Sequence, residues 1–355
     1  MKMEELKRIL EKRNLNAALF YSLSMNPNPN VVYFAQYYGV GALIVPKSQK
    51  PFLIVPEMEY ERAKKSMIKN VYGMDKKKFF ESVRLEFKER GVKAKNIGID
   101  KSAFTLLAYK NFKKQFKSIK TEDIALDCLK LREIKAESEI RKIKKAFNYA
   151  NAIIKRLLAS FKDFKTESQA AAFLEYESKK LGLGMSFPPI IASGKNASMP
   201  HHMPQNTRMQ KGFCVVDFGI RYKGYCTDIT RTVFIGRPSK KEKGIYGFLL
   251  DAQKDIINGI RANDNCGKIY DRCVKKLGNY AKYFTHGLGH GVGIEIHELP
   301  NLTLNSKDRL KENMVFTIEP GIYMHGKLGI RIEDTIALRK APEMLTKVQK
   351  ELMVI

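Results

Sequence analysis

The first third of the chain alternates short apolar runs with segments of helical periodicity. Residues 17–24, 41–46 and 51–56 are rich in β-branched and aromatic side chains, which predicts strands. Residues 3–13 and 60–68 instead space their apolar side chains three or four positions apart, which predicts amphipathic helices. Strands that alternate with helices in this way are typical of an α/β domain.

The rest of the chain combines long helical segments with paired strands. Apolar positions recur at helical spacing over residues 137–158, and Thr166 precedes another amphipathic run as a helix N-cap would. Further on, β-branched runs are joined by the turn sequences YKGY (222–225) and HGK (325–327). Helices together with antiparallel hairpins predict an α+β class for this part.

The composition changes over residues 121–140, between these two patterns. A length of 355 residues is sufficient for two domains of ordinary size, each with its own core. We therefore expect an N-terminal α/β domain of residues 1–125 and a C-terminal α+β domain of residues 126–355.

The C-terminal part contains an internal repeat. The segments GFCVVDFGI and NMVFTIEPGI superpose at an offset of 102, the distance from Asp217 to Glu319. Downstream, a second acid stands two residues before a threonine in each copy. Each copy is therefore a candidate hairpin with two acids.

The acids of such a hairpin can project from one face, because side chains alternate along a strand. Two related hairpins that face each other would bring together Asp217, Asp228, Glu319 and Glu333. Bare carboxylates so close repel one another, and burying each one uncompensated costs roughly several kcal/mol, so bound cations are expected. The alternative is a set of surface acids on amphipathic strands, but matched acids in matched apolar runs favour one site.

A glycine-rich segment, THGLGHGVGIEIHELP (285–300), supplies an imidazole to the same site. It holds three of the six histidines, and its alternating glycines permit unusual backbone dihedrals and close approach to a ligand. These features favour His290 as a ligand, with His297 nearby. Four carboxylates and one imidazole suit two hard or borderline divalent ions, and the absence of thiolates indicates a catalytic site rather than structural zinc.

These segments resemble the M24-type metallopeptidases of the pita-bread fold, the family that contains methionine aminopeptidase, aminopeptidase P and prolidase. The C-terminal strings that match are SGKNASMPHH, VVDFGIRYKGYCTDITRT, THGLGHGVGIEIHE, TIEPGIY and GIRIEDT. Residues 29–46 and 56–65 resemble the creatinase-type N-terminal domain, and residues 131–146 resemble the helix that joins the two domains. The resemblance implies an α+β pita-bread (creatinase/aminopeptidase) domain preceded by an α/β creatinase-like domain.

The resemblance also implies roles for individual residues. It makes metal ligands of Asp217, Asp228, His290, Glu319 and Glu333, for two divalent ions, manganese or cobalt first and zinc or iron as alternatives. It assigns Glu319 to proton transfer as well.

Three further residues receive catalytic roles from the same analogy. His201 and His297 correspond to the two substrate-facing histidines, with His201 chosen over His202 because it follows a proline. Arg331 matches the arginine typical of members that cleave Xaa-Pro bonds. It could orient a ligand glutamate or receive the terminal carboxylate of a dipeptide, because a guanidinium binds carboxylates bidentately.

The expected function is hydrolysis of the bond before proline, with Xaa-Pro dipeptides as substrates and a homodimer as the assembly implied by the family. An Xaa-Pro aminopeptidase acting on longer peptides is the alternative within the family. Methionine aminopeptidase is disfavoured because it generally lacks this N-terminal domain. A catalytically inactive pita-bread binding module is a third alternative, disfavoured because every ligand type is present.

The chain is strongly basic, with 64 Lys and Arg against 37 Asp and Glu and a formal net charge of +27. Residues 61–120 hold 18 of the cations and 6 of the acids, a surplus of 12. A basic surface can attract nucleic acid or acidic membranes. The lysines are spread out, however, and the one dense run (109–120) is typical of a solvated face, so nucleic acid is not an expected partner.

Five cysteines without a CxxC pair disfavour a disulfide framework and indicate a reducing compartment. The charged start, MKMEELKRILEKR, lacks the apolar segment of a secretion signal. No apolar run approaches the roughly 20 residues that span a bilayer. We therefore expect a cytoplasmic protein without a membrane partner.

Overall fold

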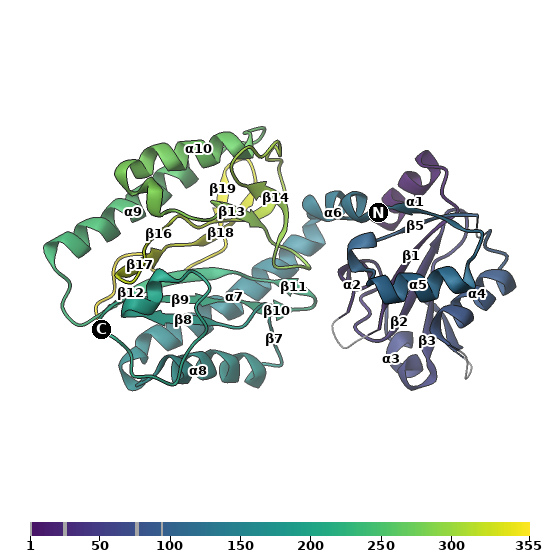
Figure 1. The fold of residues 1–355 in the computed structure, drawn as a ribbon, viewed down its shortest axis with the longest axis horizontal. Helices are drawn as coiled ribbons and strands as arrows, with labels where there is room; N and C mark the ends of the chain where they lie inside the picture. The colour runs from purple at the N-terminus through teal and green to yellow at the C-terminus, as the bar shows by residue number, and fades with distance from the viewer. Residues whose placement is uncertain (1, 24–26, 75–77, 94) are drawn as a thin grey trace. The chain divides into compact units, whose positions relative to one another are not determined.

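A computed structural model describes residues 2–23, 27–74, 78–93 and 95–355. The chain forms two compact units, Met1–Leu131 and Arg132–Ile355 (Figure 1). Helix α6 (Ala125–Glu133) contains the point of division. Among the described residues, no helix combines the length and the apolar character needed to cross a membrane.

The N-terminal unit is built on one mixed sheet. Within its described residues the strand order is β4-β3-β2-β1-β5-β6. The strands are β1 (Ala17–Ser22), β2 (Gly41–Pro46), β3 (Phe52–Pro56), β4 (Asn70–Met74), β5 (Asn96–Ile99) and β6 (Lys120–Asp123). The helices are α1 (Lys2–Lys12), α2 (Pro29–Ala35), α3 (Tyr60–Lys64), α4 (Phe79–Glu89) and α5 (Leu106–Gln115).

Both faces of this sheet are covered. Along β1, Ala18 and Phe20 belong to one apolar core, whereas Leu19 and Tyr21 belong to another. Alternate side chains of a strand point to opposite faces, so the two cores lie on opposite sides of the sheet. The predicted α/β class of this unit is therefore confirmed.

Most N-terminal elements agree with the sequence pattern, with one correction. The three predicted strands are β1, β2 and β3, although residue 24, the end of the first prediction, lies outside the described residues. The helix predicted over residues 60–68 is shorter, because α3 ends at Lys64. A turn follows, in which Ser66 Oγ accepts a hydrogen bond from the backbone N–H of Ile68.

The C-terminal unit combines helices with antiparallel sheets. The helices are α7 (Glu137–Ala159), α8 (Glu167–Lys180), α9 (Lys240–Asn258) and α10 (Cys266–Leu277). The sheets have the strand orders β11-β10-β7, β12-β9-β8, β14-β13-β15-β18-β19 and β16-β17. The strands are β7 (Gly184–Met185), β8 (Ile190–Ser193), β9 (Gly212–Phe218), β10 (Ile220–Tyr222), β11 (Tyr225–Cys226), β12 (Ile229–Ile235), β13 (Gly289–Gly291), β14 (Glu298–Leu302), β15 (Val315–Ile318), β16 (Gly321–Met324), β17 (Leu328–Arg331), β18 (Asp334–Leu338) and β19 (Pro342–Met344).

Helices cover the outer side of each half of this unit (Figure 1). Helices α7 and α8 pack together and contact β10 and β8, whereas α9 and α10 pack together and α10 contacts β14. Both helices predicted here are confirmed: α7 follows the predicted periodicity, and Thr166 caps α8 by accepting a hydrogen bond from the backbone N–H of Gln169.

The two repeated segments form the predicted hairpins. Strand β9 pairs antiparallel with β12, and β15 pairs antiparallel with β18. Both predicted turns are present, since Tyr222 pairs with Tyr225 and Met324 pairs with Leu328. At Lys223 and Gly224 φ is positive, 48° and 87°, as a tight hairpin turn of the type I′ class requires. Each copy therefore places its second acid immediately before β12 or β18.

Candidate metal centre and active site

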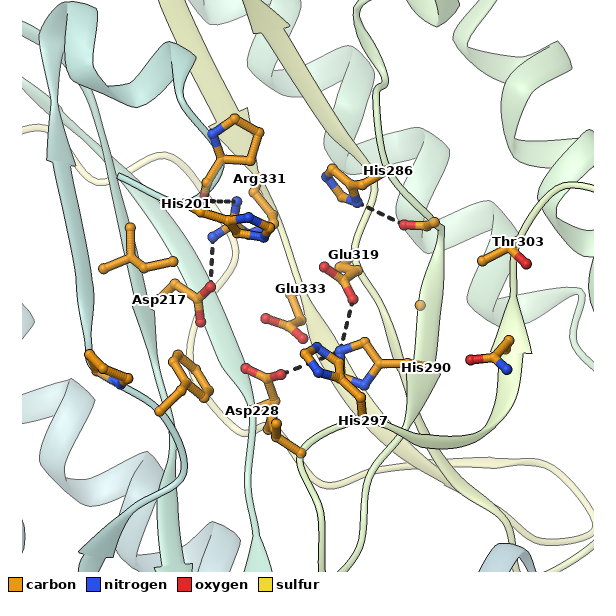
Figure 2. A pocket seen from close by; sticks show the side chains of 18 of the residues that line it. His201, Asp217, Asp228, His286, His290, His297, Thr303, Glu319, Arg331 and Glu333 are labelled. Carbon is orange, nitrogen blue, oxygen red and sulfur yellow. Dashed lines mark hydrogen bonds and ion pairs between the residues drawn. The ribbon is translucent and has the colours of Figure 1, made fainter. Parts of the chain in front are cut away.

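Five polar side chains meet where the hairpin strands begin and end. Asp217 lies on β9 and His290 on β13, while Asp228 precedes β12. Glu319 follows β15, and Glu333 precedes β18. Figure 2 shows the four carboxylates converging from both hairpins, with His290 beside them. All five line one cavity of about 460 Å³.

His290 connects the two copies of the repeat. Its Nε2 atom lies 3.3 Å from Glu319 Oε1 and 3.5 Å from Asp228 Oδ2. One possible ligand atom each from Asp228, His290 and Glu333 lies within 4.8 Å of the others. This spacing suits coordination of one ion by all three residues.

Direct bonds between the copies hold the two hairpins together. Thr230 of the first copy donates from Oγ1 to Glu333 Oε2 of the second over 2.7 Å. In the opposite direction, Thr335 Oγ1 donates to the backbone carbonyl of Asp228 over 2.9 Å. These bonds join the threonine of each copy to the second acid of the other, which explains why both copies carry the acid-x-threonine pattern.

Two carboxylate oxygens of the centre have no hydrogen-bond donor in the described part of the chain. Asp217 Oδ1 and Glu333 Oε1 are buried and have no hydrogen-bond partner among the described residues. Burial raises the pKa of Asp228 and Glu333 well above the ordinary range, and neighbouring negative charges raise each further. Divalent cations would accept these lone pairs and remove the repulsion, so the residues present fit a dinuclear metal group.

Glu319 differs from the other carboxylates. Its burial opposes ionisation, but the hydrogen bond and the charge of His290 outweigh burial and lower the pKa of Glu319 to about 2. Burial likewise opposes protonation of His290, whose pKa is raised by Glu319. The two therefore behave as an ion pair, with His290 Nε2 3.3 Å from Glu319 Oε1.

The guanidinium of Arg331 makes its hydrogen bonds to residues at the centre itself. It donates from Nη2 to Asp217 Oδ2 over 2.6 Å and from Nε to Thr230 Oγ1 over 3.1 Å. Nη1 donates to Tyr323 Oη over 2.8 Å and to the carbonyl of Pro200 over 3.3 Å. The guanidinium thus orients an aspartate, whereas the sequence leaves open the orientation of a ligand glutamate or the binding of a dipeptide's terminal carboxylate. Arg331 is only 3% exposed. This geometry favours the orienting role over that of a carboxylate receptor.

His201 and His297 both line the cavity. The ring of His297 lies edge-on to that of His290, with centroids 4.3 Å apart. Burial lowers the pKa of His297, and the charge of His290 lowers it further. His297 is therefore held as a neutral ring beside the carboxylates.

The cavity is also lined by His286, which was not predicted from the sequence as a site residue (Figure 2). Its Nδ1 lies 2.7 Å from the carbonyl oxygen of Gly287, so Nδ1 carries the proton. Nε2 is then an acceptor for Tyr323 Oη, 2.9 Å away, which itself accepts from Arg331. His286 stands four residues before His290 in the same glycine-alternating segment, and that spacing was the available signal.

The glycines of this segment serve close packing rather than unusual dihedrals. None of Gly287, Gly289, Gly291 and Gly293 is among the described glycines with positive φ. A Cβ atom on Gly289 would instead lie 2.0 Å from the carbonyl oxygen of Thr317, and one on Gly291 would lie 2.0 Å from that of Leu299. These glycines therefore allow close packing of backbone against backbone, while close approach to a ligand stays a prediction; the expectation of special backbone conformations is wrong, because φ is not positive at any of the four.

An apolar wall completes the cavity. Phe187, Pro188, Ile190, Met203 and Ile296 line it together with the polar residues. Paired hairpins that direct four carboxylates and a histidine into a cavity, covered by outer helices, define a pita-bread metallopeptidase.

Comparison with known families agrees with this class. Residues 141–340 match metallopeptidase family M24, and residues 2–134 match the creatinase/prolidase N-terminal domain. The chain belongs to metallopeptidase family M24, and it is an enzyme of the metallopeptidase class.

Individual relatives are similar over their full length. The chain is 36% identical to a Xaa-Pro dipeptidase of Pyrococcus horikoshii over 364 aligned positions, which cover 99% of each chain. The crystal structure of the prolidase from Pyrococcus horikoshii OT3 superposes with a TM-score of 0.88 at 32% identity, covering 99% of both chains. That of an X-Pro aminopeptidase from Thermotoga maritima gives a TM-score of 0.89 at 29% identity, covering 97% of this chain and 99% of the other.

Proposed function

We propose that this chain is a dinuclear metal-dependent peptidase that hydrolyses the bond before proline, with Xaa-Pro dipeptides as its preferred substrates. The observation that carries the proposal is the convergence of four carboxylates and His290 on one cavity, where two buried carboxylate oxygens have no hydrogen-bond partner in the described part of the chain. Full-length similarity to Xaa-Pro dipeptidases supports the substrate class.

The proposed ligands are the five residues that converge. Asp217, Asp228, His290, Glu319 and Glu333 would hold two divalent ions, manganese or cobalt first, with zinc or iron as alternatives. When bound, such ions lower the pKa of a water molecule toward neutrality and polarise the carbonyl under attack.

The protein's own side chains transfer the proton, bind the substrate carbonyl and orient a metal ligand. Glu319 accepts the proton of the attacking water and passes it to the departing amine. His201 and His297 donate hydrogen bonds to the substrate carbonyl, which strengthen as negative charge develops on its oxygen. Arg331 keeps Asp217 directed at the centre through the 2.6 Å bond. Proline at the second position has no N–H, so binding depends on the apolar wall instead of strand-like pairing.

One observation favours a second candidate, cleavage of longer Xaa-Pro peptides. Among the described residues lining the cavity, Arg331 is the only lysine or arginine, and its guanidinium already donates to Asp217, Thr230, Tyr323 and the carbonyl of Pro200. Along the described cavity lining, a free carboxylate on the proline of a dipeptide therefore meets no lysine or arginine besides this one, which already makes four hydrogen bonds. Comparing kcat/KM for Xaa-Pro and Xaa-Pro-Yaa peptides, with manganese or cobalt added, separates the two candidates.

The proposed function is tested by metal removal. Protein treated with a strong chelator and desalted should lose cleavage of Xaa-Pro peptides, and manganese or cobalt should restore it. The measurement is the initial rate together with the metal content per chain by elemental analysis. Cleavage that persists in metal-free protein would overturn the dinuclear proposal.

A second test addresses Glu319. Glu319→Gln keeps the size of the side chain but removes the basic carboxylate, so turnover should fall by about 100-fold or more, with substrate affinity changed only modestly. Rates with saturating peptide, and binding of a product-like inhibitor, measure the two effects. Turnover close to that of the wild type would remove Glu319 from the mechanism.

A cytoplasmic homodimer completes the proposal. All five cysteines are buried and none of them takes part in a disulfide among the described residues, which supports a reducing compartment. Light scattering on the purified chain tests the assembly.

A further inference from the structure

The loop that carries His201 is exposed and needs external anchors. His201 itself is exposed, and its neighbours Met199 and Met203 are 43% and 64% exposed. Few apolar contacts therefore hold residues 199–206 in place. A histidine that must hydrogen-bond a developing charge has to be held in one orientation, because small displacements weaken such bonds.

A buried carboxylate lies behind this loop. Glu167, the first residue of α8, is fully buried and accepts five hydrogen bonds. Its Oε1 accepts from the backbone N–H of Ser193 (2.8 Å), from Ser193 Oγ (2.8 Å) and from Asn196 Nδ2 (3.0 Å). Its Oε2 pairs with His202 Nε2 (2.8 Å) and accepts from the backbone N–H of Gln205 (3.2 Å).

These contacts fix both ends of the loop. Ser193 and Asn196 lie at the end of β8 and in the short 3₁₀ segment Gly194–Ser198, before the loop, whereas Gln205 lies near its far end. Glu167 is not among the described residues that line the cavity, so its carboxylate acts on the loop and on the segment that precedes it rather than on a bound substrate.

His201 lies between two anchored neighbours. On one side, the carbonyl of Pro200 accepts a hydrogen bond from Arg331 Nη1 over 3.3 Å. On the other, the imidazole of His202 is bound to Glu167. Figure 2 shows His201 on the same side of the cavity as Asp217.

The arrangement requires an ionised carboxylate. Five donors exceed what the single carbonyl oxygen of a glutamine could accept. Burial opposes the ionised form, but hydrogen bonds from Asn196, Ser193 and His202 outweigh it, so the pKa of Glu167 is lowered. The negative charge is therefore retained at neutral pH and its position at the N-terminus of α8 is favourable.

We propose that Glu167 is a positioning residue for catalysis: through His202 and the backbone of the loop, it holds His201 in the orientation that meets the substrate carbonyl. The inference rests on the proposed function, because His201 has its role only in peptide cleavage. It identifies Glu167 and His202, neither of which touches the substrate, as determinants of kcat.

The test combines hydrogen exchange with a double-mutant cycle. Glu167→Gln should accelerate amide exchange in residues 193–206, while exchange in α9 and α10 stays as in the wild type. It should lower kcat about tenfold with little change in KM. This loss is smaller than the roughly 100- to 1,000-fold fall in kcat that follows removal of an oxyanion donor, because His201 itself is still present. In a His201→Ala background, the same substitution should have no further effect on kcat.

Two further variants distinguish positioning of His201 from general destabilisation: the first is a control, and the second disturbs the same contact from the side of His202. Glu177→Gln removes another buried carboxylate of α8, which pairs with Arg156 2.5 Å away, and should leave kcat and loop exchange unchanged. His202→Phe leaves Glu167 and its other bonds intact, and should reproduce the loss of kcat in a weaker form even if Glu167→Gln does not fold.

The outcomes separate this inference from the proposed function. Equal loss of kcat in the wild-type and His201→Ala backgrounds would overturn the positioning role, as would unchanged exchange in the loop. If the metal-loaded wild type cleaved no Xaa-Pro peptide, the proposed function would be contradicted instead. The exchange data would still decide whether Glu167 holds the loop.

Discussion

Single residues around the centre are used for orientation as much as for ligation. Arg331 illustrates this, because its guanidinium bonds Asp217, Tyr323 and Thr230 at once. A planar fork with several fixed donors is needed for that set, and an ammonium group does not provide it. Asp217 therefore depends on Arg331 for its direction.

Arg331→Lys should weaken the centre without removing any ligand. The lysine keeps the charge but loses the bonds to Tyr323 and Thr230, so kcat/KM and metal affinity should each fall by roughly 10- to 100-fold, as for other residues that orient metal ligands. Steady-state kinetics and metal titration measure the two losses. Wild-type values for both would show that Asp217 is oriented without Arg331.

At the scale of elements, the site depends on how closely strands approach one another. Gly289 and Gly291 of β13 allow the strand that carries His290 to lie against its neighbours. The backbone carbonyl of Thr317 occupies the position that a side chain on Gly289 would need. Because that obstacle is backbone, the strand itself has to move to relieve it.

Gly289→Ala should therefore destabilise the protein by about 1–3 kcal/mol and displace His290. The matched control is Gly247→Ala in α9, where an added Cβ meets no atom of the described residues within 4 Å and helix propensity improves by roughly 0.5–1 kcal/mol. Urea unfolding gives both changes in the free energy of unfolding. If the two substitutions had the same effect, close strand packing would not be the reason for the glycine.

At the scale of the whole molecule, the C-terminal unit holds mutually repelling carboxylates that have to be compensated. The raised pKa values of Asp228 and Glu333 reflect burial together with neighbouring charge. Any ion that binds only the folded chain stabilises it by mass action. Metal binding should thus be measurable as stability, without any substrate.

Thermal unfolding should occur at a higher temperature with manganese or cobalt than with chelator. At a metal concentration 100 times the dissociation constant, the added stability is about 2.7 kcal/mol. Differential scanning calorimetry measures the shift, and Glu333→Gln should reduce it strongly because one proposed ligand loses its charge. A melting temperature independent of metal would contradict a site in the folded chain.

Much of the fold followed from local patterns. The periodicity of residues 137–158, the cap at Thr166 and both turns predicted elements that the structure contains. The length of the helix predicted over residues 60–68 was overestimated, because the apolar spacing continues past Lys64 into a turn stabilised by Ser66. Short segments of this kind are decided by tertiary contacts more than by propensity.

The convergence of the acids also followed from the sequence, because the repeat encodes two similar hairpins with acids at matched positions. The participation of His286 and Tyr323 was not predicted, since their link to Arg331 joins residues from three strands or loops. The support that Glu167 gives to His202 spans 35 positions along the chain. Hydrogen bonds of this kind have no periodicity to detect.

By itself, the sequence determined the two domains' secondary-structure classes and the identity of the converging acids, because strand alternation, turn residues and helix caps act over a few positions. Only the tertiary structure decided which partner Arg331 holds and how His201 is oriented. Arg331 and Asp217 are 114 positions apart along the chain, and folding brings Arg331 Nη2 to 2.6 Å from Asp217 Oδ2. Contacts at such separations depend on how the hairpins pack against each other, which no local pattern specifies.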